Sequence, residues 1–183
     1  MRERKKATIL IVDDDKSNIN ILLNILQDYD VIACLDGKTA IEMAIKEDID
    51  LILLDIVMPQ MDGFEVCSIL KTDAATENIP IIFLSAKRDM EDINRGFELG
   101  AVDYIVKPFF PIELKCHVRT HIKLQNYQRD LEKKNIELEQ LNQKIKDVVK
   151  KDMQDLYESS ECFSSKDIDL DNLDSYLDNI SLD

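Results

Sequence analysis

Residues 8–15 read Thr8-Ile-Leu-Ile-Val-Asp-Asp-Asp15, a short apolar run that ends abruptly in three aspartates. Such a run, bounded by polar residues, is typical of a strand buried on both faces of a sheet. Four further runs follow along the chain, the first of them with the weakest pattern. The predicted strands are Thr8–Val12, Val31–Cys34, Leu51–Leu54, Ile81–Leu84 and Tyr104–Val106.

Between these strands, apolar residues recur with the spacing of a helix face. The sets are Ile21, Leu22, Ile25 and Leu26; Ala40, Ile41, Ala44 and Ile45; Phe64, Val66, Ile69 and Leu70; and Ile93, Phe97 and Leu99. Because a helix separates consecutive strands, parallel pairing with right-handed crossovers is expected. The predicted fold is therefore a doubly wound α/β domain with a five-stranded parallel sheet. Four glycines and four prolines are too few for the turns of an all-β protein.

The chain is strongly acidic, with 23 Lys and Arg against 37 Asp and Glu and a net charge of −14. Such a charge repels nucleic-acid phosphates and anionic membranes, so neither direct nucleic-acid binding nor membrane insertion is expected. The four cysteines are scattered with no CxxC pair, which argues against a disulfide framework or a four-cysteine zinc site. The sequence has no signal-peptide core and no apolar run of transmembrane length. A cytoplasmic protein is expected.

After Pro111 the chain contains neither Gly nor Pro, and a seven-residue repeat emerges. Seven of its eight core positions are apolar or aromatic, which predicts a long helix that forms a coiled coil, with a homodimer as the expected assembly. A helix folded back on its own domain is the alternative. We call these positions the seam: Leu124, Leu131, Leu138 and Ile145, with Tyr127, Lys134, Leu141 and Val148 three residues later.

The repeat fails at Asp152 and Asp155, and from Asp152 to Asp183 ten acidic residues accompany a single lysine. This composition predicts a flexible acidic tail, in which Asn172–Ile180 has the spacing of a short amphipathic helix. The predicted segments are the α/β domain at 1–124, the coiled-coil extension at 125–157 and the tail at 158–183.

Polar residues follow the predicted strands at one edge of the sheet, where ligands bind in open parallel α/β folds. Asp13 and Asp14 follow the first strand, Asp55 the third, Ser85 the fourth and Lys107 the fifth. Two carboxylates about 4 Å apart repel by roughly 4 kcal/mol at an effective dielectric near 20. A hard divalent cation such as Mg²⁺, together with Lys107, is therefore expected to offset their charge.

In that setting the Asp55 carboxylate can attack phosphorus to give an aspartyl phosphate, to which Ser85 donates a hydrogen bond. The plainer alternative is that the aspartates only cap a helix or begin a turn. That alternative suffices for any one residue but not for four strand ends at once.

Four stretches in this order resemble the receiver domain of bacterial response regulators over residues 7–124. They are Ile9–Asp15, Leu51–Pro59 with Met61–Gly63, Phe83–Ala86 and Asp103–Phe109. The resemblance implies a flavodoxin-like fold and a two-component response regulator that accepts a phosphoryl group from a histidine kinase or phosphotransfer protein. Such a protein is not an enzyme beyond its own phosphoryl transfer and dephosphorylation. Its output would be contact with a downstream protein, unless the chain is a fragment of a longer one.

The resemblance also implies a role for each site residue. Asp55 is the phosphoacceptor; Asp13, Asp14, Asp55 and the backbone carbonyl of Val57 hold Mg²⁺ or Mn²⁺; Lys107 contacts the phosphoryl group; and Ser85 and Tyr104 form the switch pair. The Lys107–Pro108 peptide bond is expected to be cis. Val57 and Lys87 occupy the positions that set the lifetime of the aspartyl phosphate in this family, and they predict one that is not especially short.

Two other interpretations fit parts of the sequence. Asp13-Asp-Asp15-Lys-Ser17 fits the Asp-x-Asp-x-Ser motif of haloacid-dehalogenase-like phosphatases, with Asp13 as nucleophile and Asp15 as acid, but it leaves the residues around Asp55 unexplained. A receiver that serves as a constitutive dimeric scaffold is the other. Separately, His117 and His121 share one helix face and could ligate a metal, but without a further ligand cluster a solvated face is the favoured interpretation.

Overall fold

The structure, a computed structural model, describes residues 6–86 and 90–159, without the side chains of 156–159. Strands and helices alternate along this part of the chain. They are β1 (Thr8–Val12), α1 (Lys16–Ile25), β2 (Asp30–Cys34), α2 (Gly37–Lys46), β3 (Leu51–Asp55), α3 (Gly63–Thr72), β4 (Ile81–Ser85), α4 (Met90–Glu98), β5 (Asp103–Val106) and α5 (Pro111–Ser159). The chain divides into two compact units, Met1–Tyr127 and Gln128–Asp183.

The strands form one parallel sheet in the order β2-β1-β3-β4-β5. This arrangement confirms the predicted doubly wound α/β fold. Val12 lies opposite Leu54, Asp55 opposite Leu84, and Ser85 opposite Val106. The register therefore places the carboxyl ends of the four adjacent strands β1, β3, β4 and β5 side by side along one edge.

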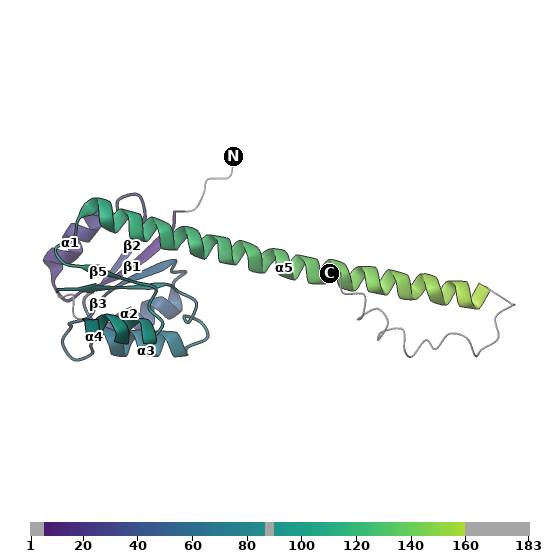
Figure 1. The fold of residues 1–183 in the computed structure, drawn as a ribbon, viewed down its shortest axis with the longest axis horizontal. Coiled ribbons are helices and arrows are strands. Elements are labelled where there is room, and N and C mark those ends of the chain that lie inside the picture. The colour runs from purple at the N-terminus through teal and green to yellow at the C-terminus, as the bar shows by residue number, and fades with distance from the viewer. Residues whose placement is uncertain (1–5, 87–89, 160–183) are drawn as a thin grey trace. The chain divides into compact units, whose positions relative to one another are not determined.

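Helices cover both faces of the sheet and bury two separate apolar layers (Figure 1). On one face, Leu22 of α1 and Leu114 of α5 pack with alternate strand residues such as Ile11. On the other face, Ala40 of α2 and Leu70 of α3 pack with the strand residues of opposite parity. Both faces of the central strands are apolar because both are covered, as the continuous apolar runs of the sequence predicted.

Helix α4 docks differently from the prediction. The sequence pattern placed Phe97 on the apolar face of this helix, but the Phe97 side chain is exposed. The buried residue of α4 is Gly96. A Cβ atom at this position would lie 3.0 Å from the Phe83 ring, so the backbone of α4 itself packs on the sheet. The Arg95 guanidinium lies 4.3 Å from the centre of the Phe64 ring and adds a cation–π contact.

An aspartate caps each of the helices α1, α2 and α3, which follow the first three strands. Asp15 accepts a hydrogen bond from the Ser17 N–H, and Asp62 forms a reciprocal capping box with Glu65 at the start of α3. Gly63 is required for close approach, since a Cβ atom there would lie 2.2 Å from the Asp55 carbonyl oxygen. Its own N–H donates to the Ile56 carbonyl at 2.8 Å. The start of α3 thereby fixes the backbone around Asp55.

Helix α5 has a packed part and an exposed part. In the first unit, Leu114, Val118 and Ile122 are buried against the sheet. From Gln128 to Asp155, in the second unit, every side chain is exposed or half-buried. Among residues 6–86 and 90–159, we find no helix with the length and apolar character needed to span a membrane. Residues 160–183, which hold the predicted Asn172–Ile180 helix, are outside the described part of the chain.

Replacing Gly63 with Ala is expected to lower the free energy of unfolding by about 1–3 kcal/mol, the usual cost of overpacking. The added methyl group would meet the Asp55 carbonyl and force apart β3 and α3. Urea unfolding followed by circular dichroism measures the change. Ser68→Ala, at an exposed position of the same helix, is the control and should change the free energy by less than about 0.5 kcal/mol. Equal values for the two variants would contradict the close-approach role of Gly63.

Candidate functional site

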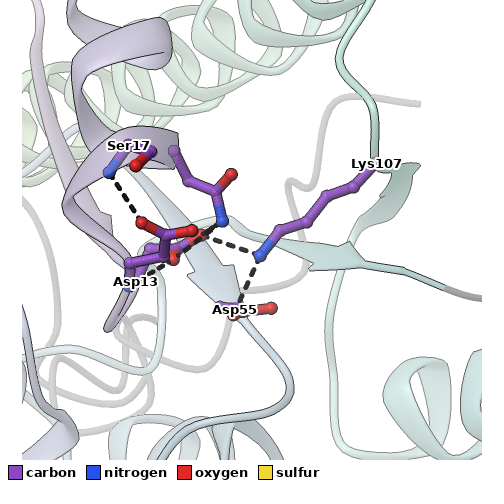
Figure 2. Close-up of polar contacts among 6 residues, drawn as sticks. Asp13, Ser17, Asp55 and Lys107 are labelled. Carbon is purple, nitrogen blue, oxygen red and sulfur yellow. Dashed lines mark hydrogen bonds and ion pairs between the residues drawn. The ribbon is translucent and has the colours of Figure 1, made fainter.

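The residues predicted from the strand ends converge at one edge of the sheet. Asp13 directly follows β1, Asp55 is the last residue of β3, Ser85 is the last residue of β4, and Lys107 directly follows β5. Asp13, Asp55 and Ser85 are buried. Figure 2 shows the side chains of Asp13, Asp55 and Lys107 pointing toward one another from three different strands.

Lys107 lies between the two buried carboxylates. Its Nζ is 2.8 Å from Oδ2 of Asp13 and 2.8 Å from Oδ2 of Asp55 (Figure 2). Burial lowers the pKa of the Lys107 ammonium, but its hydrogen bonds and ion pairs with Asp13 and Asp55 outweigh burial and hold that pKa above the usual value. Lys107 therefore stays positively charged at neutral pH and supplies a fixed cation to the site.

Asp13 has the most fully occupied carboxylate of the group. Besides Lys107, it accepts a hydrogen bond from the Asp15 backbone N–H at 2.9 Å. The Asn18 side-chain amide lies 3.1 Å from each of the two Asp13 oxygens. A buried charge held by several donors has little freedom to turn. The orientation of the Asp13 carboxylate in the site is therefore fixed by its hydrogen bonds.

Asp55 has a different electrostatic environment. Burial raises the pKa of its carboxyl group, and the neighbouring Asp13 raises it further. The contacts with Lys107 and a backbone hydrogen bond from Val57 act in the opposite direction but do not cancel the increase. The result is a carboxylate poorer in hydrogen bonds than Asp13 and more basic than an ordinary aspartate, which are properties suited to a nucleophile.

The carboxylates of Asp13, Asp14 and Asp55 each offer an oxygen within 4.8 Å of the others. Asp14 is exposed, so the cluster opens to solvent on that side. Three carboxylates and one lysine leave an excess of two negative charges, and the donors are all hard oxygens. This donor set fits a hexacoordinate Mg²⁺ that keeps some of its waters. The Val57 carbonyl, predicted as a further ligand, belongs to the loop directly after β3.

Two other predicted residues lie beside this cluster. Ser85 is buried at the end of β4, and Tyr104 is half-buried on β5, packed against the apolar layer that contains Phe64 and Phe83. The peptide bond between Lys107 and Pro108 is cis, which confirms that prediction. Lys87, predicted to influence the lifetime of the aspartyl phosphate, lies outside the described residues.

Asn18 also contacts the site, although the sequence pattern did not predict it. The signal was present, because Asp15 caps α1 and residue 18 is then the third helical residue, on the first turn. A polar side chain on that turn reaches back toward the strand end that precedes the helix. Asn18 has no charge, so it holds the Asp13 carboxylate in place without neutralising it.

The fold and the acidic site together define a flavodoxin-like α/β protein with buried carboxylates and a lysine at its strand ends. Residues 9–119, more than half of the chain, match the family model described as the response regulator receiver domain. The chain belongs to this family. Receiver domains take phosphoryl groups from histidine kinases in two-component signalling and bind Mg²⁺ at this acidic cluster.

Curated relatives share the receiver part of the chain. A Vibrio cholerae protein named "Probable cyclic di-GMP phosphodiesterase" is 47% identical over 124 residues, which are 67% of this chain and 28% of that protein. A "Probable transcriptional regulator ycf27" of Porphyridium aerugineum is 42% identical over 122 residues, 65% of this chain and 49% of that protein. The chain therefore matches about half or less of the length of these relatives.

Solved structures show the same fold. The chemotaxis protein CheY4 of Vibrio cholerae matches with a TM-score of 0.61 and 32% identity over 63% of this chain and 98% of its own. The receiver domain of the sensor histidine kinase PA1611 of Pseudomonas aeruginosa matches with a TM-score of 0.60 and 28% identity, over 64% of this chain and 98% of its own. The latter structure has a magnesium ion coordinated in its active-site cleft.

Replacing Lys107 with Met is expected to lower the free energy of unfolding by about 3 kcal/mol, because it leaves two buried carboxylates without their shared cation. Excess Mg²⁺ should restore part of this loss. Lys115→Met is the matched control: the Lys115 side chain is 50% exposed and 3.6 Å from Asp28, so its loss should cost less than about 1 kcal/mol. Denaturant unfolding with and without Mg²⁺ measures both. A Lys107 variant as stable as the Lys115 variant would contradict the bridging role.

Proposed function

We propose that this chain is a response regulator whose Asp55 accepts a phosphoryl group from a histidine kinase or phosphotransfer protein in a Mg²⁺-dependent reaction. The observation that carries the proposal is the convergence of Asp13, Asp55 and Lys107, with 2.8 Å between the lysine nitrogen and each carboxylate. Membership of the receiver family supports the same reaction. Asp55 is the preferred nucleophile because Asp13 is already saturated with donors.

Each residue of the acidic site has a distinct role in the proposed phosphoryl transfer. An Asp55 oxygen forms a bond to phosphorus while the phosphorus–nitrogen bond of the donor phosphohistidine breaks, and its electron pair returns to the imidazole. Mg²⁺ held by Asp13, Asp14 and Asp55 would supply positive charge for the phosphoryl oxygens. The Lys107 Nζ contacts Asp55 and is therefore within reach of a phosphoryl group formed on that residue. Asp13, held by Asn18, keeps its orientation throughout.

The proposed switch follows from the added charge. Phosphorylation places about −1.5 to −2 charges beside the end of β4. Ser85 then donates to the phosphoryl group, and Tyr104 turns inward into the space that becomes available. Val57 is exposed and has no polar side-chain group to position an attacking water. We therefore expect an aspartyl phosphate that is not especially short-lived.

The geometry disfavours the phosphatase interpretation. That mechanism needs Asp15 as a general acid near Asp13, but the Asp15 carboxylate caps α1 by accepting the Ser17 N–H. Hydrogen bonds from Ser17 hold the pKa of Asp15 below its usual value, which opposes a role as proton donor. The complete set of Asp13, Asp14, Asp55 and Lys107 likewise argues against a scaffold that does not use phosphorylation.

For the output, we propose a homodimeric coiled coil formed by the seam with a second copy of this chain. Ile122, which faces the sheet, is 7% exposed, whereas Leu124 is 52% exposed. Two residues turn a helix by about 200°, so the seam begins on the side of α5 opposite its own domain. The apolar seam residues from Leu131 to Val148 are also exposed. A regular seven-residue repeat suits a second helix better than an irregular partner.

The proposed domain boundaries follow from these parts: a receiver at 1–124, a coiled-coil extension at 125–157 and an acidic tail at 158–183. The similarity to the Vibrio cholerae phosphodiesterase covers 28% of that protein, within its matched receiver part. For this chain we therefore propose receiver phosphorylation and a protein–protein output.

Incubating the whole chain with Mg²⁺ and acetyl phosphate is expected to add one phosphoryl group, because the small donor needs no partner protein. Intact-protein mass spectrometry detects the addition. The mass gain should disappear in Asp55→Asn and when a chelator removes Mg²⁺. Asp28→Asn, at an exposed aspartate outside the acidic cluster, is the matched control and should be phosphorylated normally. A gain that persists in Asp55→Asn but disappears in Asp13→Asn would instead support the phosphatase interpretation.

Replacing Leu138 with Asp is expected to dissociate the proposed dimer. A charged side chain at the centre of a coiled-coil seam would lose its hydration without gaining a partner of opposite charge. Ile136→Asp is a closely matched control: Ile136 is 54% and Leu138 is 56% exposed, but Ile136 lies off the seam. Light scattering coupled to gel filtration gives the mass of each variant and of a chain truncated after Lys123. The coiled-coil proposal would be wrong if the truncated and whole chains had the same oligomeric state.

A further inference from the structure

Helix α5 carries two sets of polar side chains that the proposed phosphoryl transfer does not use. In the first unit, Oδ2 of Asp103 at the start of β5 forms hydrogen bonds with His117 and His121. The sequence favoured a solvated helix face for these histidines, but the structure shows that a carboxylate from β5 meets both and links the strand to α5. The second set lies in the second unit and consists of charged residues that flank the seam.

These charged residues recur every seven positions, each one residue before the first position of a heptad. In a two-stranded coiled coil, such residues lie at the edge of the core and face the other helix. All four side chains are exposed. Two negative charges come first along the chain, and two positive charges follow. We call them the flanking charges: Asp130, Glu137, Lys144 and Lys151.

A parallel, in-register dimer leaves the flanking charges without partners of opposite sign. Parallel pairing brings each of them against the residue five positions later in the other helix. For the first three flanking charges, the facing residues are neutral. They are Asn135, Asn142 and Val149. The same alignment places Lys134 of one chain opposite Lys134 of the other at a core position, where two like charges repel and lose hydration.

Antiparallel pairing gives every flanking charge a partner of opposite sign. In this orientation the residues that precede the seam positions face one another across the edge of the core. The order of signs, negative then positive, is reversed in the second helix. Asp130 then faces the partner's Lys151, and Glu137 faces the partner's Lys144. The two-fold symmetry of the dimer repeats both contacts, so all four flanking charges of each chain are paired.

The flanking charges also select one antiparallel register. Shifting the helices by one heptad in one direction would place Glu137 opposite its own copy on the two-fold axis. Shifting them by one heptad in the other direction would place Lys144 opposite its own copy. Each shift therefore introduces a contact between like charges at the centre of the dimer, which the register with Glu137 opposite Lys144 avoids.

In the same register the core of the coiled coil is apolar except at Lys134. The apolar pairs are Leu131 with the partner's Val148, and Leu138 with the partner's Leu141. Lys134 faces the partner's Ile145 instead of a second lysine, so its stem can lie along an apolar side chain while its ammonium group stays in water. The apolar seam residues of this stretch are 53–60% exposed in the single chain and are available for the contact.

We propose that two copies of this chain form an antiparallel coiled coil in which Glu137 of each copy faces Lys144 of the other. The inference rests on the homodimer proposed above and adds its orientation and register. Exposed charge pairs are individually weak, and their agreement in a single alignment selects the orientation more than it adds affinity. Because each receiver precedes its own helix, the two receivers lie at opposite ends of the coiled coil.

Charge reversal in the whole chain tests the pairing. Glu137→Lys and Lys144→Glu should each weaken the dimer about tenfold or more, because each turns two attractive contacts into repulsive ones. Both changes in one chain restore opposite charges and should return the dissociation constant to within about threefold of its original value. Glu139→Lys and Lys146→Glu, also seven residues apart but away from the core edge, are the matched controls and should change it by less than about threefold. Sedimentation equilibrium measures each constant, and circular dichroism checks that each variant is helical.

Disulfide formation between introduced cysteines tests the orientation. The background is a chain in which serine replaces the exposed Cys116 and also Cys162, so the remaining native thiols are buried. Mixing Lys134→Cys chains with Ile145→Cys chains in a glutathione redox buffer should give a covalent dimer that contains one of each. Lys134→Cys chains alone should give none, whereas a parallel dimer would join them. Mass spectrometry identifies the bridge.

The outcomes distinguish this inference from the proposed homodimer. The mixed disulfide, together with recovery of the dimer in the double charge reversal, is the expected result. A disulfide between two Lys134→Cys chains, or a double reversal that dimerises no better than the single ones, overturns the antiparallel orientation and leaves the homodimer standing. A whole chain that is monomeric in sedimentation overturns both. Phosphorylation of Asp55 is measured separately by the mass gain and depends on none of these results.

Discussion

The double ion pair of Lys107 with Asp13 and Asp55 is the interaction on which the organisation of the site depends. Two buried carboxylates from β1 and β3 are brought together by the sheet register, and without a cation they would repel each other strongly. The lysine comes from β5, at the edge of the sheet, and reaches past β4 to both. Lys107 therefore links the carboxyl end of β5 to the carboxyl ends of β1 and β3, neither of which is next to β5 in the sheet. The same atoms that stabilise the fold are those that a phosphoryl group and a cation would contact.

Much of this arrangement was predictable because it follows from topology. Continuous apolar runs such as Leu51–Leu54 identify strands covered on both faces, and parallel order then forces the residues after each run to one edge. Asp55 and Lys107 could thus be placed together although they are far apart in sequence. The docking of α4 was not predictable, because Gly96 packs through its backbone and Arg95 through an aromatic face, and neither contributes to apolar periodicity. Asp103 was missed for a related reason, since its partners lie on α5.

Strand β5 is the element common to every proposed activity of the receiver. Lys107 follows its carboxyl end, Tyr104 lies in its middle, and Asp103 begins it beside His117 and His121. Ile105 anchors it to α5 in the core. A change at the acidic edge would therefore act on a strand that is held to α5 by hydrogen bonds at its other end. As an edge strand, paired on one side with β4 alone, β5 is also less constrained than the central strands.

Because α5 is one continuous helix, the number of residues between its sheet-facing part and its seam determines the direction in which the seam faces. Its sheet-facing residues end near Ile122 and its seam begins at Leu124, on a helix without Gly or Pro between Pro111 and Ser159. Because each residue turns the helix by about 100°, one residue inserted between Gln125 and Leu131 would rotate the seam by more than a quarter turn, whereas seven would return it to within about 20°. In the proposed coiled coil, the direction from which the partner helix approaches α5 would thus depend on chain length, independently of which side chains form the contact.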